Sequence, residues 1–170
     1  MNPDGARRGH LRTNANGVDL NRAWGEPDPV QSPEVFLVRR RMQETGVDFC
    51  LDVHGDEALP HNFVAGFEGI PSVTNRQLAL LDSYTAALAA RNPDFQTAKG
   101  YPKSAAGKAN MAMCTNWTAE TFGSLSMTLE MPFKDATETP DAEFGWSPPR
   151  CRALAESCLE VLQGMIGELR

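Results

Sequence analysis

Three groups of residues in this sequence carry side chains that could do chemistry together. His54 and Glu130 each follow a short apolar run, and the loop from Arg12 to Arg22 is rich in asparagine. An imidazole can bind a metal or move a proton, and a carboxylate in a cleft can act as a general base. The planar arginine guanidinium suits a bound carboxylate, and a neighbouring asparagine adds a neutral donor. Asn21 and Arg22 could therefore bind an anionic group.

The elements that must position these residues can be predicted from the spacing of apolar residues. Residues 47–53 and 124–131 are apolar and β-prone, which predicts buried strands ending at His54 and Glu130. Helical spacing and terminal Pro or Gly residues predict helices over residues 33–45, 75–91, 117–122 and 147–169. These elements predict a mixed α/β fold with buried strands. Ligands gather beyond the carboxyl ends of strands in open α/β sheets, which is where His54 and Glu130 are expected.

Two segments lack such a pattern. Residues 1–30 are rich in Asn, Gly, Arg and Asp, which predicts loop and short strand lying over another part of the molecule. Residues 94–116 fit neither a helix nor a strand clearly.

Composition limits the classes of partner. The 170 residues, 41% hydrophobic and 22% charged, fit one globular domain. A net charge of −6 provides no basic surface for nucleic acid or an anionic membrane, and no apolar run is long enough to span a bilayer. The four cysteines form no CxxC pair, which favours reduced thiols. We expect a cytoplasmic protein with no nucleic-acid or membrane partner.

Four motifs follow one another along the chain: NPDG at residues 2–5, DLNR at 19–22, LDVHGD at 51–56 and TLEMPF at 128–133. This order resembles the zinc metallocarboxypeptidases, and most closely the bacterial members of the cytosolic carboxypeptidase branch. The resemblance runs from Asn2 to about Trp146. It implies an α/β fold with a mixed, mostly parallel sheet flanked by helices. It also implies a hydrolase that releases C-terminal residues from peptides or proteins by metal-activated water.

The resemblance also implies catalytic roles for single residues. His54 is similar in position to the family's third zinc ligand, and a neutral imidazole is a common zinc donor. Glu130 resembles the general base that takes a proton from the attacking water. Arg12 resembles the arginine that stabilises the tetrahedral oxyanion, a role that needs a fixed positive charge.

Substrate-binding roles follow in the same way. Asn21 and Arg22 resemble the pair that binds the free C-terminal carboxylate of the substrate. Tyr101 is a candidate for the family's mobile-loop tyrosine, with a packed loop tyrosine as the alternative. Lys103 or Lys108, in the same loop, could contact an acidic side chain of a substrate.

The sequence departs from the family at the zinc site. The family takes its first two zinc ligands from an HxxE motif before NPDG, whereas the HxxE of this chain is residues 54–57, in the context of the third-ligand site. His10 and His61 are interpreted as surface or loop histidines. We therefore expect residues 1–170 to be the C-terminal part of a carboxypeptidase catalytic domain, without a second domain and without its upstream strands. Such a chain should bind zinc weakly, have little or no peptidase activity alone, and self-associate through an uncovered sheet edge.

Two other functions compete with this interpretation. The first is a metal-free module that binds peptide C-termini, although Glu130 would repel a bound carboxylate there. The second is a zinc amidohydrolase of the related acylase type, which shares the general sheet and a histidine at a strand end.

Overall fold

A three-stranded mixed sheet forms the centre of the molecule. The computed structural model describes residues 1–169, with strands β1 (Phe49–Asp56), β2 (Phe63–Ala65) and β3 (Leu125–Pro132) in the order β1-β3-β2. Strands β1 and β3 are parallel, whereas the short β2 runs antiparallel to β3. The predicted mixed α/β class is confirmed, and the longer of the two strand pairings is the parallel one.

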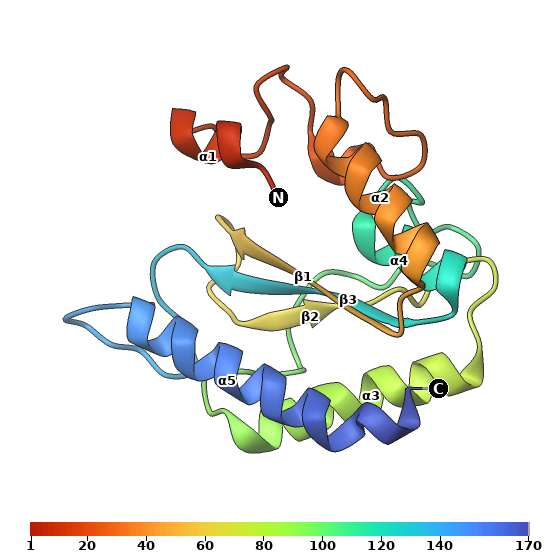
Figure 1. Ribbon diagram of the computed structural model, residues 1–170. Coiled ribbons are helices and arrows are strands. Elements are labelled where there is room, and N and C mark those ends of the chain that lie inside the picture. The colour runs from red at the N-terminus through yellow and green to blue at the C-terminus, as the bar shows by residue number, and fades with distance from the viewer. Residues whose placement is uncertain (170) are drawn as a thin grey trace.

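Helices cover both faces of this sheet. Figure 1 shows α3 (Asn75–Arg91) and α5 (Pro148–Met165) on one face, and α2 (Pro33–Thr45) and α4 (Cys114–Phe122) on the other. The chain also forms α1 (Pro3–Arg8) and two short 3₁₀ helices, Leu20–Arg22 and Ile166–Glu168. Helix α1 lies on the same side of the sheet as α2 (Figure 1). Within residues 1–169, no helix is long and apolar enough to cross a membrane.

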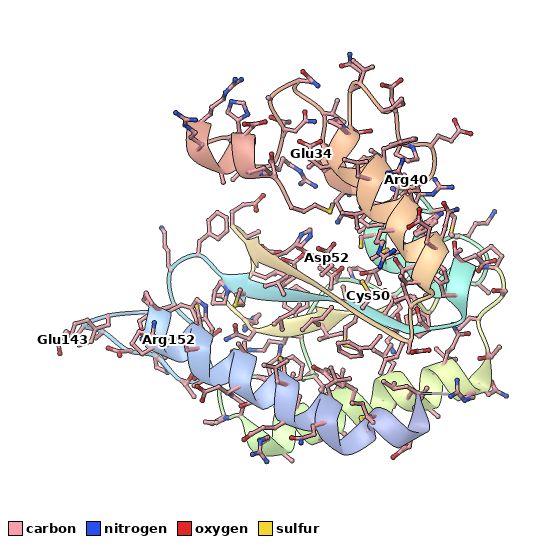
Figure 2. All side chains as sticks on the ribbon, viewed as in Figure 1. Glu34, Arg40, Cys50, Asp52, Glu143 and Arg152 are labelled. Carbon is pink, nitrogen blue, oxygen red and sulfur yellow. The ribbon has the colours of Figure 1, made fainter. Side chains whose placement is uncertain are left out.

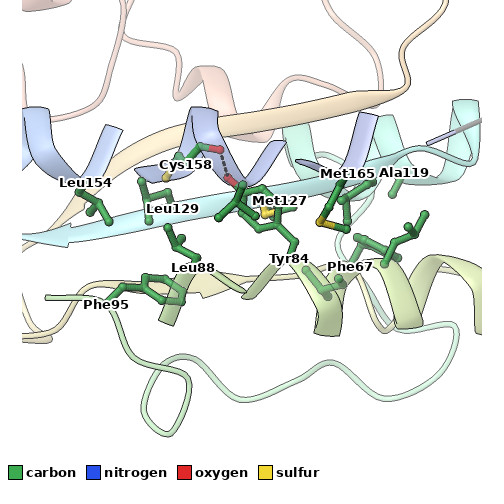
Figure 3. Close-up of a cluster of buried hydrophobic side chains, with 14 of the residues drawn as sticks. Phe67, Tyr84, Leu88, Phe95, Ala119, Met127, Leu129, Leu154, Cys158 and Met165 are labelled. Atoms are coloured by element: carbon green, nitrogen blue, oxygen red, sulfur yellow. Dashed lines mark hydrogen bonds between the residues drawn. The ribbon is translucent and has the colours of Figure 1, made fainter. Parts of the chain in front are cut away.

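The alternation of side chains along the strands separates the core from the polar face. Leu125, Met127 and Leu129 of β3 are buried in the main core. Figure 3 shows Met127 and Leu129 among side chains from α3 and α5. The Tyr84 hydroxyl donates to the backbone oxygen of Cys158 at 3.2 Å, which satisfies a polar group inside this core. The intervening residues of β3 face α4, and Thr128 lies 2.7 Å from the Thr115 hydroxyl. A smaller apolar cluster on this second side consists of Leu20, Trp24, Val35, Cys114 and Trp117.

Most predicted elements are present, with shifted ends. Strand β1 continues through His54 to Asp56, so the histidine lies within the strand and not just after it. Helix α4 begins at Cys114, three residues before the predicted start. Gly123 follows its last residue with a φ of 64°, a left-handed conformation that glycine adopts readily.

The prediction for residues 1–30 was wrong in part. Pro3–Arg8 forms a helix, because Asn2 caps it by accepting the N–H of Gly5 at 3.0 Å and proline fits the first helical turn. Its apolar content is too small for hydrophobic spacing to reveal a helix. Strand β2, only three residues long, gave no signal in the sequence.

Candidate active site

His54 and Glu130 are neighbours across the two parallel strands. The register pairs them directly, and strand alternation places Asp52, His54 and Asp56 on the same face of β1. Figure 2 shows Asp52 projecting from β1 towards the side that holds α1 and α2. The two best predicted strands therefore bring the predicted zinc ligand and the predicted base together.

The imidazole of His54 is held between two carboxylates. Its Nε2 lies 3.0 Å from Asp52 Oδ2, and its Nδ1 lies 3.8 Å from Glu130 Oε1. The hydrogen bond to Asp52 raises the pKa of His54 against the opposing effect of burial. Because Asp52 occupies Nε2, Nδ1 is the nitrogen that faces Glu130. The sequence interpretation missed Asp52, although the spacing of Asp52 and His54 on one strand is a signal that could have identified it.

Glu130 is a buried carboxylate with partners at only one of its two oxygens. Only 5% of the residue is exposed, and Oε2 has no hydrogen-bond partner among the described residues. Burial raises the pKa of Glu130 to about 7; the charge of His54 opposes this rise, and the charge of Asp56 adds to it. A carboxyl group with a pKa near neutrality suits general base catalysis.

The loop that holds Arg12 is organised by Asp19. Asp19 Oδ2 lies 2.9 Å from Arg12 Nε, and Asp19 Oδ1 accepts the backbone N–H of Asn21 at 3.1 Å. A β-bridge between Thr13 and Asp19 closes the loop. One aspartate thus fixes both Arg12 and the start of the 3₁₀ helix that carries Arg22. Asp19 was not singled out in the sequence, because its role depends on a turn that no pattern predicts.

Asn21 is oriented by helix α4. Its side-chain Oδ1 accepts the backbone N–H of Cys114 at 2.8 Å, which leaves Nδ2 without a hydrogen bond among the described residues. Arg22 donates from Nη1 to the backbone oxygen of Asn21 at 2.8 Å and is otherwise exposed. Two donors are therefore available to a ligand at this point.

A cavity of about 770 Å³ joins these groups. All six site residues predicted from the sequence line it: Arg12, Asn21, Arg22, His54, Tyr101 and Glu130. The volume lies within the range of small-molecule sites. Tyr101 comes from the irregular segment before α4, and its hydroxyl lies 3.4 Å from Glu130 Oε1. The roles of the six residues remain predictions, but the fold brings the residues together.

The other residues considered in the sequence lie elsewhere or at the rim. Lys103 forms an ion pair with Glu68 at 2.9 Å and lines a separate cavity of about 130 Å³. Neither Lys103 nor Lys108 lines the main cavity. His61 is buried and lies 2.9 Å from Glu138. His10 contacts the backbone oxygens of its own loop. Neither histidine lines the main cavity.

The described residues do not form a complete metal site. Residues 1–169 contain no group of three or more His, Cys, Asp or Glu side chains placed to hold a metal ion. A catalytic zinc takes three protein ligands. Nδ1 of His54, 3.8 Å from Glu130 Oε1, is a suitable donor, but two more donors are needed.

The fold is similar to solved structures of bacterial metallo-carboxypeptidases. The structure matches the metallo-carboxypeptidase from Pseudomonas aeruginosa with a TM-score of 0.98 and 48% identity, covering 100% of this chain and 45% of that one. It matches the metallo-carboxypeptidase from Burkholderia cenocepacia with a TM-score of 0.94 and 42% identity, covering 98% of this chain and 44% of that one. No family model matches the sequence.

The chain therefore has the fold of the bacterial metallo-carboxypeptidases over somewhat less than half their length, and the resemblance predicted from the sequence is confirmed. Cytosolic carboxypeptidase 6 from Mus musculus is 31% identical over 72 residues, which are 39% of this chain and 13% of that protein. An uncharacterized protein from Zymomonas mobilis is 54% identical over 169 residues, which are 99% of this chain and 44% of that protein.

Proposed function

We propose that this chain is the part of a zinc-dependent metallocarboxypeptidase that binds the peptide C-terminus and supplies the general base. The observation that carries this proposal is the state of Glu130, a buried carboxylate whose Oε2 has no partner and which lines the same cavity as Arg22. A buried carboxylate oxygen without a partner costs free energy in a purely structural role. A reaction in which Glu130 accepts a proton explains why it is kept there.

Asn21 and Arg22 bind the free carboxylate of the substrate. Arginine forms charge-assisted hydrogen bonds with a carboxylate, and Nδ2 of Asn21 adds a neutral donor beside it. The Pseudomonas aeruginosa structure was solved with (2-guanidinoethylmercapto)succinic acid, a compound whose name denotes two carboxylates and a guanidine. A ligand of that protein that contains carboxylates is in keeping with a carboxylate-binding role for these two residues here.

Glu130 takes a proton from the attacking water and passes it to the amine of the leaving residue. Arg12 stabilises the negative charge on the carbonyl oxygen, and Asp19 holds its guanidinium in place. Zinc, when bound, supplies a Lewis acid for the water and the carbonyl, and His54 is the donor that this chain offers it.

The limited span of the chain restricts what it does alone. With one imidazole donor, it binds zinc weakly and has little or no peptidase activity. Its partners are peptide or protein C-termini, with no nucleic acid and no membrane. We place it in the cytoplasm because its four cysteines are free thiols and cytosolic carboxypeptidases are among its relatives.

Peptide binding tests the carboxylate site. We expect the chain to bind a short peptide with a free C-terminus more tightly than the same peptide amidated, measured by calorimetry. Arg22→Met should weaken binding by about tenfold or more, since a charge-assisted hydrogen bond is lost. Arg8→Met is the matched control, because Arg8 is exposed on α1 and does not line the cavity. Equal affinity for both peptides would refute the proposal.

Repeating the titration with zinc separates two functions. A gain in peptide affinity that His54→Ala abolishes supports the metalloenzyme. The absence of a three-donor group in residues 1–169 favours the alternative, a metal-free module for peptide C-termini. In that case zinc has no effect, and Glu130→Gln tightens binding because the repulsion between carboxylates is removed.

A further inference from the structure

Asp56 is a buried carboxylate for which neither the family resemblance nor the proposed reaction supplies a role. It is the last residue of β1 and is 4% exposed. Asp56 is in none of the ion pairs found within residues 1–169, and its carboxylate is stabilised by hydrogen bonds. Its Oδ1 accepts the backbone N–H groups of Ala58 at 2.6 Å and Leu59 at 2.8 Å. Its Oδ2 accepts a hydrogen bond from the hydroxyl of Tyr101.

These three donors hold the Asp56 side chain in one orientation. The two backbone N–H groups bind Oδ1 from the turn that follows β1, which leaves Oδ2 as the oxygen that receives the Tyr101 hydroxyl. Asp56, at the end of β1, lines the wall of the cavity.

Tyr101 reaches this oxygen from a segment without regular secondary structure. Its ring meets that of Phe63 edge-on, with the centroids 4.9 Å apart, and 47% of the residue is exposed. Gly100 allows this approach, because a Cβ there would lie 2.8 Å from the Phe63 ring. Packing on one side thus places the phenol, but it leaves the hydroxyl free to turn between two carboxylates.

The choice of partner matters for Glu130. The Tyr101 hydroxyl has one proton, and Glu130 Oε1, at 3.4 Å, is the more distant of its two acceptors. A tyrosine that donated to Glu130 would stabilise the carboxylate and make it a weaker base. Donation to Asp56 leaves Glu130 without this stabilising hydrogen bond.

We propose that Asp56 is a positioning residue that accepts the Tyr101 hydrogen bond, fixes the phenol at the cavity wall and withholds its proton from Glu130. This inference rests on the carboxypeptidase function proposed above, because it assigns Asp56 a task at the same site. Its test uses the chain without zinc or peptide, so it can fail independently of that function.

Nitration of tyrosine by tetranitromethane measures the state of Tyr101. The chain has two tyrosines, and Tyr84 is fully buried, so modification at Tyr101 is identified by peptide mass and Tyr84 is the internal reference. The reagent attacks the phenolate, whose population Asp56 suppresses. In Asp56→Asn the amide oxygen can still accept from Ala58 and Leu59, while the negative charge beside the phenol is gone. We expect nitration of Tyr101 to be faster by about tenfold for each unit by which its pKa falls.

Glu57→Gln is the matched control, because it removes a neighbouring carboxylate that does not contact Tyr101. It should nitrate at the wild-type rate. An Asp56→Asn variant with an unchanged circular dichroism spectrum and unchanged nitration of Tyr101 would overturn the proposal.

A second measurement needs no change at Asp56. The tyrosinate absorbance of the wild-type chain, minus that of Tyr101→Phe, gives the ionisation of Tyr101. Burial and the hydrogen bond to Asp56 raise the pKa of Tyr101, so its ionisation should begin well above that of a free tyrosine. Ionisation at the ordinary value of about 10 would also overturn the proposal.

Discussion

At the scale of single residues, a buried or half-buried charged group can either bind several partners or leave one of its atoms without any. Arg150 illustrates the first case. Its guanidinium lies 2.6 Å from Asp94 Oδ1 and 3.1 Å from Asp135 Oδ1, and it stacks 4.9 Å above the centre of the Trp146 ring. This cation joins the start of α5 to two loops. Glu130 illustrates the second case, because its Oε2 is buried without a partner among the described residues.

The pair of Asp94 and Arg150 predicts a dependence of stability on pH. The hydrogen bond from Arg150 lowers the pKa of Asp94 in the folded chain below its unfolded value of about 3.9. A carboxyl group of this kind contributes stability above its unfolded pKa and loses it as the pH falls through its folded pKa. Asp94→Asn should therefore lower the free energy of unfolding at neutral pH by about 1–3 kcal/mol, measured by urea denaturation.

Glu44→Gln provides the control, since Glu44 pairs with Arg41 at 3.2 Å on an exposed surface. It should change stability by less than about 1 kcal/mol. The difference between Asp94→Asn and the wild type should shrink in acid. An equally large difference at about pH 3 would show that the charge of Asp94 is not the cause.

At the scale of elements, local hydrogen bonding determines where helices begin. Thr74 precedes α3 and forms a reciprocal capping box: its hydroxyl accepts the backbone N–H of Gln77 at 3.2 Å, and Gln77 Oε1 accepts the backbone N–H of Thr74 at 3.0 Å. Ser147 occupies the same position before α5, but its side chain makes no capping hydrogen bond.

The two N-caps predict different mutational costs. Thr74→Ala should lower the free energy of unfolding by about 1 kcal/mol, because an N–H at the start of α3 loses its partner. Ser147→Ala changes the same position of α5 without removing such a bond, and its cost should be clearly smaller. Thermal or urea unfolding of both variants measures the difference. Equal losses would mean that intrinsic helix propensity, and not the cap, accounts for the effect.

Helices and long strands could be predicted because their signals are local. The apolar spacing and terminal residues of 33–45 and 75–91 coincide with α2 and α3 as observed. Which side chains of α3 enter the core is a different matter: Leu80, Leu81, Tyr84 and Leu88 are buried, whereas Leu78 is partly exposed. The rotation of a helix against its neighbours decides this, and it depends on tertiary packing.

The candidate site was predictable as a set of residues but not as a hydrogen-bond network. Motif order identified His54 and Glu130, and the register of β1 and β3 then makes them neighbours. Asp19, Asp52 and Asp56 were missed, because each acts through a partner that is distant in sequence or through a turn. Such contacts exist only once the strands and loops have been assembled.

At the scale of the whole molecule, the chain spans about 45% of the length of its structural relatives and presents an open sheet edge. Within residues 1–169, β1 pairs only with β3, so the outer backbone groups of eight residues have no strand beside them. Val53 lies in this strand and is 57% exposed. An exposed edge strand with an apolar side chain is a template for pairing with another chain.

We therefore predict concentration-dependent self-association of the chain through β1, measured by sedimentation velocity or light scattering. Val53→Lys should weaken it, because a charged side chain on an edge strand opposes pairing. Val30→Lys is the matched control, since Val30 is 70% exposed in a loop outside the sheet. Both substitutions add the same charge, so a general effect on solubility would appear in both variants. A selective loss of association in Val53→Lys assigns the contact to β1, whereas equal behaviour of the two variants, or a monomer at every concentration, would exclude it.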